Sequence, residues 1–183
     1  TLDYNRLRLT GELSYEKWQD ISATIILDNE NIYAFKERQN RNRSSIYRAK
    51  VNYSGEKHLL SIGLQRVPFG VGRIYNPIDI YNPIDITAIE TQERKGTEAL
   101  RYEYAINELS NFDLTLSKHK HAARIKGFLE VADVALIILK DSRNKLDIIG
   151  YEIEGEWGES DITLRSEGGR FADAKNDDIY YKY

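Results

Sequence analysis

Charged side chains between residues 66 and 96 are the first candidates for chemistry in this chain. The candidates in this stretch are three arginines and three of its carboxylates: Arg66, Arg73, Asp79, Asp85, Glu90 and Arg94. Charges of both signs on one loop can face a water-filled passage and act on the ions that cross it. They can equally form Arg–Asp pairs that hold the loop in place. The sequence leaves both interpretations open.

Arrangements typical of metal sites or catalysis are weak. His119 and His121 would share one face of a strand, but the lysines beside them disfavour a bound cation. The acidic residues from Asp173 to Asp178 lack the spaced ligands and central glycine of an EF-hand loop. No Ser–His arrangement or Gly-rich phosphate loop is recognisable. We therefore expect no enzyme, no catalytic residue, no metal and no cofactor.

A second set of charged residues lies on segments that alternate with period two. Leu7 and Leu9 alternate with Arg6 and Arg8, which places apolar and charged side chains on opposite faces of a strand. In a barrel the charged faces of such segments would line the lumen, although a solvated face of a soluble sheet would look the same. The lumen candidates by parity include Arg48, Lys50, Arg101, Glu103, Arg124, Lys126, Glu152, Glu154 and Arg165.

The alternating segments predict an all-β chain of ten or eleven strands in an antiparallel meander. We expect short turns at residues 54–57 and 107–111, and longer charged connections at residues 36–43 and 118–122. The stretch 132–139 is apolar at almost every position. Its orientation cannot be predicted from the pattern.

Residues 67–95 interrupt the alternation. All three prolines of the chain lie in or beside this stretch, and Ile-Tyr-Asn-Pro-Ile-Asp occurs twice in tandem at residues 74–79 and 80–85. Proline blocks pairing in a sheet and Asn-Pro favours a turn, so the stretch predicts a structured loop. Because it also carries apolar residues such as Phe69, Ile78 and Ile84, it should pack against another part of the protein.

Composition limits the class of protein. The 183 residues suffice for one domain, and the absence of cysteine excludes disulfides, zinc ribbons and thiol nucleophiles. A net charge of -3 argues against a nucleic-acid partner. The longest nearly apolar run, residues 131–139, is far shorter than the ~20 residues of a membrane-spanning helix. The 13 tyrosines are an excess that composition alone leaves unexplained.

The alternation fits two architectures. In a soluble barrel or sandwich the apolar face forms the core, whereas in a transmembrane barrel it faces lipid. Strands of about 10 residues favour the transmembrane barrel. Aromatic residues near strand ends favour it too, because they would form a girdle at the membrane interface: Tyr15, Trp18, Tyr33, Tyr47, Tyr53, Tyr102 and Trp157.

The segment 63–104 resembles part of the porin-like outer-membrane β-barrels of Gram-negative bacteria. The similarity is carried by Gly63 and Arg66, by Phe69 and Gly70, by Asn-Pro-x-Asp at 76–79 and 82–85, and by Gly96 and Ala99. The resemblance implies an outer-membrane channel for passive diffusion of small polar solutes or ions, in contact with the lipid bilayer and lipopolysaccharide. It also implies an inward-folded loop that shapes the pore.

Barrels of that family are larger than this chain. We therefore expect residues 1–183 to form one barrel domain, or the N-terminal part of a larger barrel. Two alternatives remain: a soluble or secreted barrel or sandwich that binds a ligand such as a carbohydrate, and a structural barrel that encloses a partner protein. A homo-oligomer or a separate plug protein would be compatible with the barrel.

Overall fold

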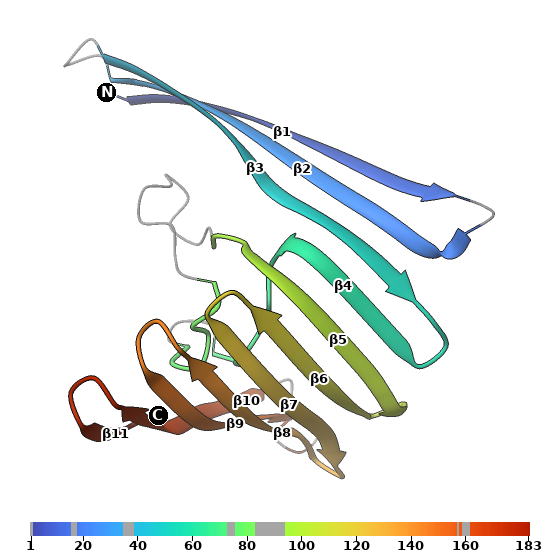
Figure 1. Ribbon diagram of the computed structural model, residues 1–183, viewed down its shortest axis with the longest axis vertical. Helices are drawn as coiled ribbons and strands as arrows, with labels where there is room; N and C mark the ends of the chain where they lie inside the picture. The colour runs from blue at the N-terminus through green and yellow to red at the C-terminus, as the bar shows by residue number, and fades with distance from the viewer. Residues whose placement is uncertain are drawn as a thin grey trace.

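The computed structural model describes residues 2–15, 18–34, 39–72, 76–82, 94–156, 158 and 162–183. Eleven strands follow one another in a single antiparallel sheet, each hydrogen-bonded to the next along the chain (Figure 1). This arrangement confirms the predicted all-β meander. The strands are β1 (Leu2–Tyr15), β2 (Trp18–Ala34), β3 (Gln39–Ser54), β4 (His58–Gln65), β5 (Thr97–Asn107), β6 (Ser110–Ser117), β7 (Lys120–Leu129), β8 (Ala132–Asp141), β9 (Leu146–Glu156), β10 (Thr163–Asp173) and β11 (Asp178–Lys182).

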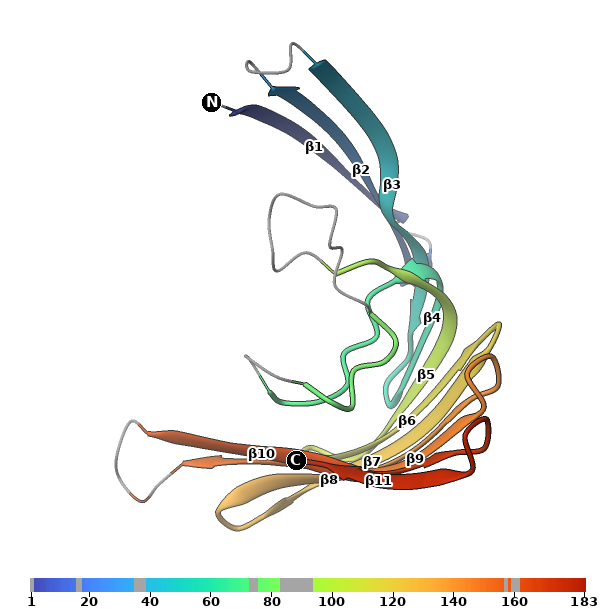
Figure 2. The same cartoon turned by 90° about the vertical axis from the view of Figure 1, so that its left-hand side faces the viewer.

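The sheet curves into an open arc (Figure 2). Within the described residues the edge strands β1 and β11 do not pair with each other, so the arc is not closed into a barrel. The described ranges also contain no helix long and apolar enough to cross a membrane.

Two connections differ from the sequence prediction. Residues 39–43, predicted as part of a charged loop, belong to β3, and Asn29 of β2 donates to Asn42 (3.1 Å) and Ser44 (2.8 Å) across the strands. The predicted long loop at 118–122 is a tight turn. There the Ser117 hydroxyl accepts from the Lys120 backbone N–H (3.2 Å) and donates to its carbonyl (3.0 Å). The short turns predicted near 54–57 and 107–111 are confirmed.

The two faces of the arc differ in chemistry. We call the concave side the inner face and the convex side the outer face. The strand register places Arg101, Asp113 and Arg124 on the inner face, whereas the leucines and isoleucines between them point outward. The apolar stretch of β8 divides in the same way: Ile137 is buried on the inner face, and Leu136 is 60% exposed on the outer face.

The core of the protein lies on the concave side. We call the chain between β4 and β5, residues 66–96, the inward loop. Its described parts at residues 66–72 and 76–82 lie over the inner face of β5–β10 (Figure 2). Its apolar side chains are buried against side chains of β7–β10. The core members from the loop are Val67, Phe69, Ile78 and Tyr81, and those from β8–β10 include Ile137, Leu139, Ile148 and Phe171.

Candidate functional site

The two asparagines of the tandem repeat hold the inward loop together. Asn82 is fully buried; its amide donates to the Val67 carbonyl (2.5 Å) and its side-chain oxygen accepts from the Val67 N–H (3.0 Å). Asn76 donates to the Phe69 carbonyl (2.9 Å) and accepts from the Asp79 N–H (2.8 Å). The two asparagines occupy equivalent positions in the six-residue repeat. They bind the backbone of Phe69 and Val67, which lie two residues apart in the preceding part of the loop.

Two paired glycines of the inner face, Gly150 and Gly169, leave a depression in the sheet that receives Ile78 of the loop. We call this depression the glycine dent. Gly150 on β9 pairs with Gly169 on β10, and both lie on the inner face. A Cβ atom at Gly150 would lie 2.6 Å from Cδ1 of Ile78, and one at Gly169 would lie 3.3 Å from it. Because neither glycine has a side chain, Ile78 can reach the backbone of the sheet and anchor the loop there.

Two carboxylates of the sheet bind the backbone of the loop. Glu167 on β10 accepts from the N–H groups of Val71 (2.5 Å) and Gly72 (2.7 Å), and Glu152 on β9 accepts from that of Gly70. Three consecutive backbone donors are thus satisfied by acidic side chains of the inner face. A hydrogen bond to an ionised carboxylate is stronger than one between neutral groups, so these contacts fix the loop firmly on β9 and β10.

Beneath the loop lies a network of alternating charge on β5, β6, β7 and β9. Asp113, whose side chain is completely buried, pairs with Arg101 and with Arg124 (3.5 Å), and Arg124 also reaches Glu152 (3.4 Å). Arg101 pairs further with Glu103 (2.9 Å). Buried charges are tolerated when they are paired and hydrogen-bonded in this way.

The loop contacts this network through its backbone and one aromatic ring. Arg124 donates to the Pro68 carbonyl (3.4 Å), and its guanidinium carbon lies 5.3 Å from the centre of the Phe69 ring. The Tyr81 hydroxyl donates to the Thr115 carbonyl (3.3 Å), and Lys120 donates to the Ile80 carbonyl. Burial raises the pKa of Tyr81, and the Asp113 and Asp141 carboxylates add to the shift, so the hydroxyl remains a donor.

At its other end the loop is joined to β3. Arg94 lies 3.3 Å from Asp79 and donates to the Asn82 carbonyl (3.2 Å), while its own carbonyl accepts from Arg48 (2.9 Å). Burial raises the pKa of Asp79 above its ordinary value, although the hydrogen bonds from Asn82 and the charge of Arg94 oppose the shift. Of the two interpretations of the loop charges, the Asp79–Arg94 contact matches the one in which they hold the loop in place.

A bulge in β3 turns Tyr47 toward the charged face. The register shifts between Ile26 and Leu27 of β2, so that Ile46 faces outward and Tyr47 is the extra residue. The guanidinium carbons of Arg8 and Arg48 each lie 4.0 Å from the centre of the Tyr47 ring. The prediction of Tyr47 as part of an outer aromatic girdle is therefore wrong, because alternation breaks at a bulge.

The predicted lumen residues lie on the inner face, several of them in ion pairs. Besides the pairs given above, Lys126 lies 2.6 Å from Asp133 and Arg165 lies 2.5 Å from Glu154. Lys50 lies between Thr24 and Gly63 on the same face. Arg66 is exposed at the start of the loop. Arg73, Asp85 and Glu90, together with Tyr15, Trp18 and Trp157 of the predicted girdle, lie outside the described residues or have side chains that the structure does not describe.

Sequence reasoning missed Asp113, which pairs with two arginines, and Glu167, which binds the loop backbone. Both occupy charged-face positions in alternating segments, so parity could have identified them. Nothing in the sequence showed that Glu167 would meet backbone N–H groups of a loop more than ninety residues earlier. In the part of the chain that the structure describes, no three metal-ligating side chains come together.

Comparisons with models of known protein families, with curated proteins and with solved structures found no match for this chain. The resemblance to porin-like outer-membrane barrels therefore rests on the motifs in residues 63–104.

Proposed function

We propose that this chain forms the wall of a porin-like β-barrel in the outer membrane of a Gram-negative bacterium, with the inward loop inside the lumen. Small polar solutes or ions cross through the space that the loop leaves open. Completion of the open arc into a closed barrel is part of this proposal.

The observation that carries the proposal is the inverted distribution of polar and apolar side chains. The carboxylates of Asp28, Asp113 and Glu152 are buried on the inner face, whereas Leu136 and Ile138 are 60% and 65% exposed on the outer face. Every one of the eleven strands contributes at least one exposed large apolar residue. A water-soluble protein rarely exposes so large an apolar surface, but a lipid-facing barrel wall requires one.

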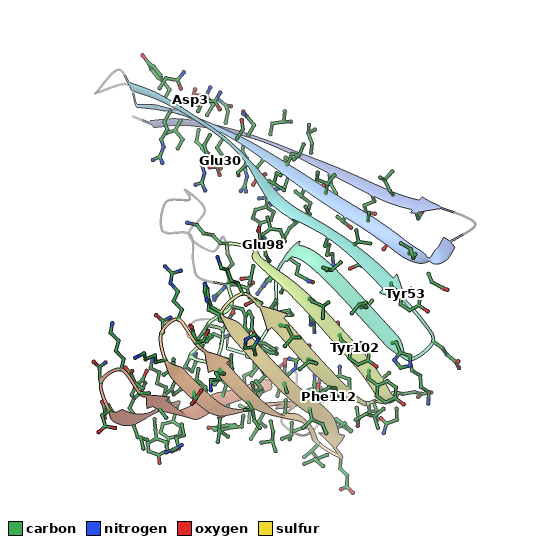
Figure 3. The ribbon with its side chains drawn as sticks, viewed as in Figure 1. Asp3, Glu30, Tyr53, Glu98, Tyr102 and Phe112 are labelled. Atoms are coloured by element: carbon green, nitrogen blue, oxygen red, sulfur yellow. The ribbon has the colours of Figure 1, made fainter. Side chains whose placement is uncertain are left out.

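Aromatic residues at one end of the strands support a position in a membrane. Tyr53, Tyr102 and Phe112 lie near the same rim of the sheet, beside the turns that join β3 to β4 and β5 to β6 (Figure 3). His58 stacks on Tyr102 with ring centres 5.9 Å apart, and its Nδ1 lies 2.7 Å from the Tyr102 hydroxyl. Tyrosines with an apolar ring and a polar tip are typical of the interface between lipid and water.

The consecutive residues Lys50 and Val51 allow a direct test of which face meets lipid. They are adjacent on β3, with Lys50 on the inner face and Val51 on the outer face, where it is about half exposed. The chain has no native cysteine, so Lys50→Cys and Val51→Cys each create a single labelling site. The label is an environment-sensitive fluorophore on protein reconstituted into phospholipid vesicles. A lipid-soluble nitroxide should quench it at position 51, and a water-soluble quencher should reach it at position 50.

Planar-bilayer conductance then separates a channel from the alternatives. A soluble binding module would stay in solution without detergent, and both labels would be quenched from water. A structural barrel filled by a partner protein would show the membrane labelling pattern without conductance. Discrete conductance steps together with opposite quenching at positions 50 and 51 are the expected result.

A further inference from the structure

We infer that one rim of the sheet, over β6–β9, binds anionic lipid headgroups that carry phosphate. This inference rests on the proposed position in a membrane and adds to it the class of lipid that this rim contacts. The rim is formed by the turn between β6 and β7 and the turn between β8 and β9. It lies at the end of the strands opposite to Tyr53 and Tyr102 (Figure 3).

The turns of this rim are joined by hydrogen bonds. The Ser142 N–H donates to the His119 carbonyl (2.8 Å), and the Ser142 hydroxyl donates to the same oxygen (3.0 Å). The turn between β10 and β11 is joined to them as well, because the Ala174 N–H donates to the Lys145 carbonyl (3.0 Å). The three turns lie side by side in Figure 2. The backbone that carries the basic side chains is therefore held in one arrangement.

Exposed basic side chains gather on the first two of these turns and on the adjoining end of β8. We call them the basic rim: Lys118, Lys140, Arg143 and Lys145. Within the described parts of the chain, none of the four is in an ion pair. The exposed carboxylates of Glu98 and Asp147 lie at the same rim, so positive charge is in excess. The β10–β11 turn has charges of both signs and is not part of the basic rim.

An apolar band borders the basic rim on the outer face. The outer-face positions of β8 from Ala132 to Ile138 are all apolar, and Lys140 follows directly. Their cross-strand neighbours on β7 and β9 carry no charge. At about 3.4 Å per residue this band is roughly 20 Å long. Transmembrane barrels have an apolar band of ~25 Å. Lys140 therefore lies at the level where lipid headgroups begin.

The opposite end of these strands carries negative charge. The turn between β5 and β6 exposes Glu108, and the turn between β7 and β8 exposes Glu130. Leu109 and Val131 beside them are 63% and 75% exposed. Anionic lipid attracts lysine and arginine side chains near the membrane surface and repels carboxylates. Phosphate oxygens also accept charge-assisted hydrogen bonds from both basic side chains. Anionic headgroups are therefore favoured at the basic rim and disfavoured at the opposite rim.

The test compares the lipids that contact the outer face beside each rim. The chain has no native cysteine, so Ile138→Cys and Val131→Cys each give one site for a fluorescent label on protein reconstituted into phosphatidylcholine vesicles. The quencher is phosphatidylglycerol or phosphatidylcholine with a nitroxide on its acyl chain, at the same mole fraction. We expect phosphatidylglycerol to quench several-fold more strongly than phosphatidylcholine at position 138, and the two lipids to quench equally at position 131. The excess at position 138 should shrink at high salt.

Neutral substitutions then assign the preference to the basic rim. Lys140→Gln/Arg143→Gln/Lys145→Gln should remove the excess quenching at position 138. Lys57→Gln, in the exposed turn between β3 and β4 at the opposite rim, is the matched control and should leave the excess unchanged.

Three results would overturn the inference and leave the membrane position intact. They are equal quenching by the two lipids at position 138 before any basic residue is changed, the same excess at position 131, and an unchanged excess in the triple variant. The first two do not depend on the triple variant folding. Absence of quenching by either lipid at both positions would contradict the membrane position itself.

Discussion

The side chain of Asn82 bonds to the backbone of Val67 as a neighbouring strand would. It accepts one hydrogen bond from the Val67 N–H and donates one to the Val67 carbonyl, and both residues are fully buried. Asn82→Ala removes both bonds and leaves two buried backbone groups without a partner. Each such group costs about 1–3 kcal/mol. We expect a clear loss in the free energy of unfolding, measured by denaturant titration in detergent.

Asn76 provides the matched comparison for this change, because it occupies the equivalent place in the repeat but is only half-buried. Asn76→Ala should destabilise the protein less than Asn82→Ala, because the Asn76 position is partly exposed and water can enter the space that its side chain leaves. Equal losses for the two variants would show that burial does not distinguish the two halves of the repeat.

The glycine dent predicts coupling between Gly150 and Ile78. Gly150→Ala places a methyl group where Ile78 now lies, and Ile78→Ala opens a cavity that costs roughly 2–5 kcal/mol. In the double variant the new methyl group partly fills that cavity. The double variant should therefore be more stable than the sum of the single changes by about 1 kcal/mol or more. Strictly additive changes would show that the two residues do not meet. Gly127→Ala is the control, because its new Cβ would lie 3.3 Å from the Ser110 hydroxyl oxygen and not near Ile78. Its effect should add to that of Ile78→Ala.

In a membrane, a charged side chain placed on the outer face should destabilise the folded protein. Leu136→Arg places a guanidinium in the middle of β8 on the proposed lipid side, at a cost of about 2–4 kcal/mol in a membrane barrel. Folding efficiency into vesicles, followed by heat-dependent gel mobility, measures the loss. Leu109→Arg, at the exposed turn between β5 and β6, is the control and should fold normally. Normal folding of Leu136→Arg would count against lipid contact at β8.

Asp79 should make stability depend on pH. Because burial raises its pKa above the ordinary 3.8, the unfolded chain ionises Asp79 more readily than the folded one. The contribution of Asp79 to stability is therefore greatest below pH 3.8 and falls as pH rises to the raised value. Over that window the unfolding midpoint of Asp79→Asn should change less with pH than the midpoint of the native protein. Parallel pH profiles would contradict the raised pKa.

Much of the sheet could be predicted because the backbone of a strand imposes period two on its side chains. Charged positions such as Arg101 and Glu152 reached the inner face as the alternation indicated. The prolines and the tandem repeat likewise located the inward loop. These signals are local, so one sequence is sufficient to detect them.

What could not be predicted depends on contacts between distant segments. The bulge at Tyr47 reversed one side chain, and no local signal marks it. In β8 the residues on both faces are apolar because one face meets the loop and the other is exposed, so alternation disappears. The glycines at positions 150 and 169 gain meaning only when Ile78 is placed above them.

The contacts of the inward loop also constrain the order in which the protein assembles. Each strand pairs with its neighbour in the sequence, so the sheet can grow hairpin by hairpin with little loop-closure entropy to overcome. The loop is different, because Gly70 and Val71 find their carboxylates 82 and 96 residues later in the chain. These contacts can form only after β9 and β10 have joined the sheet. A chain that ends before β9 could therefore make the loop contacts to β6 and β7, but it would lack the carboxylates that bind Gly70, Val71 and Gly72.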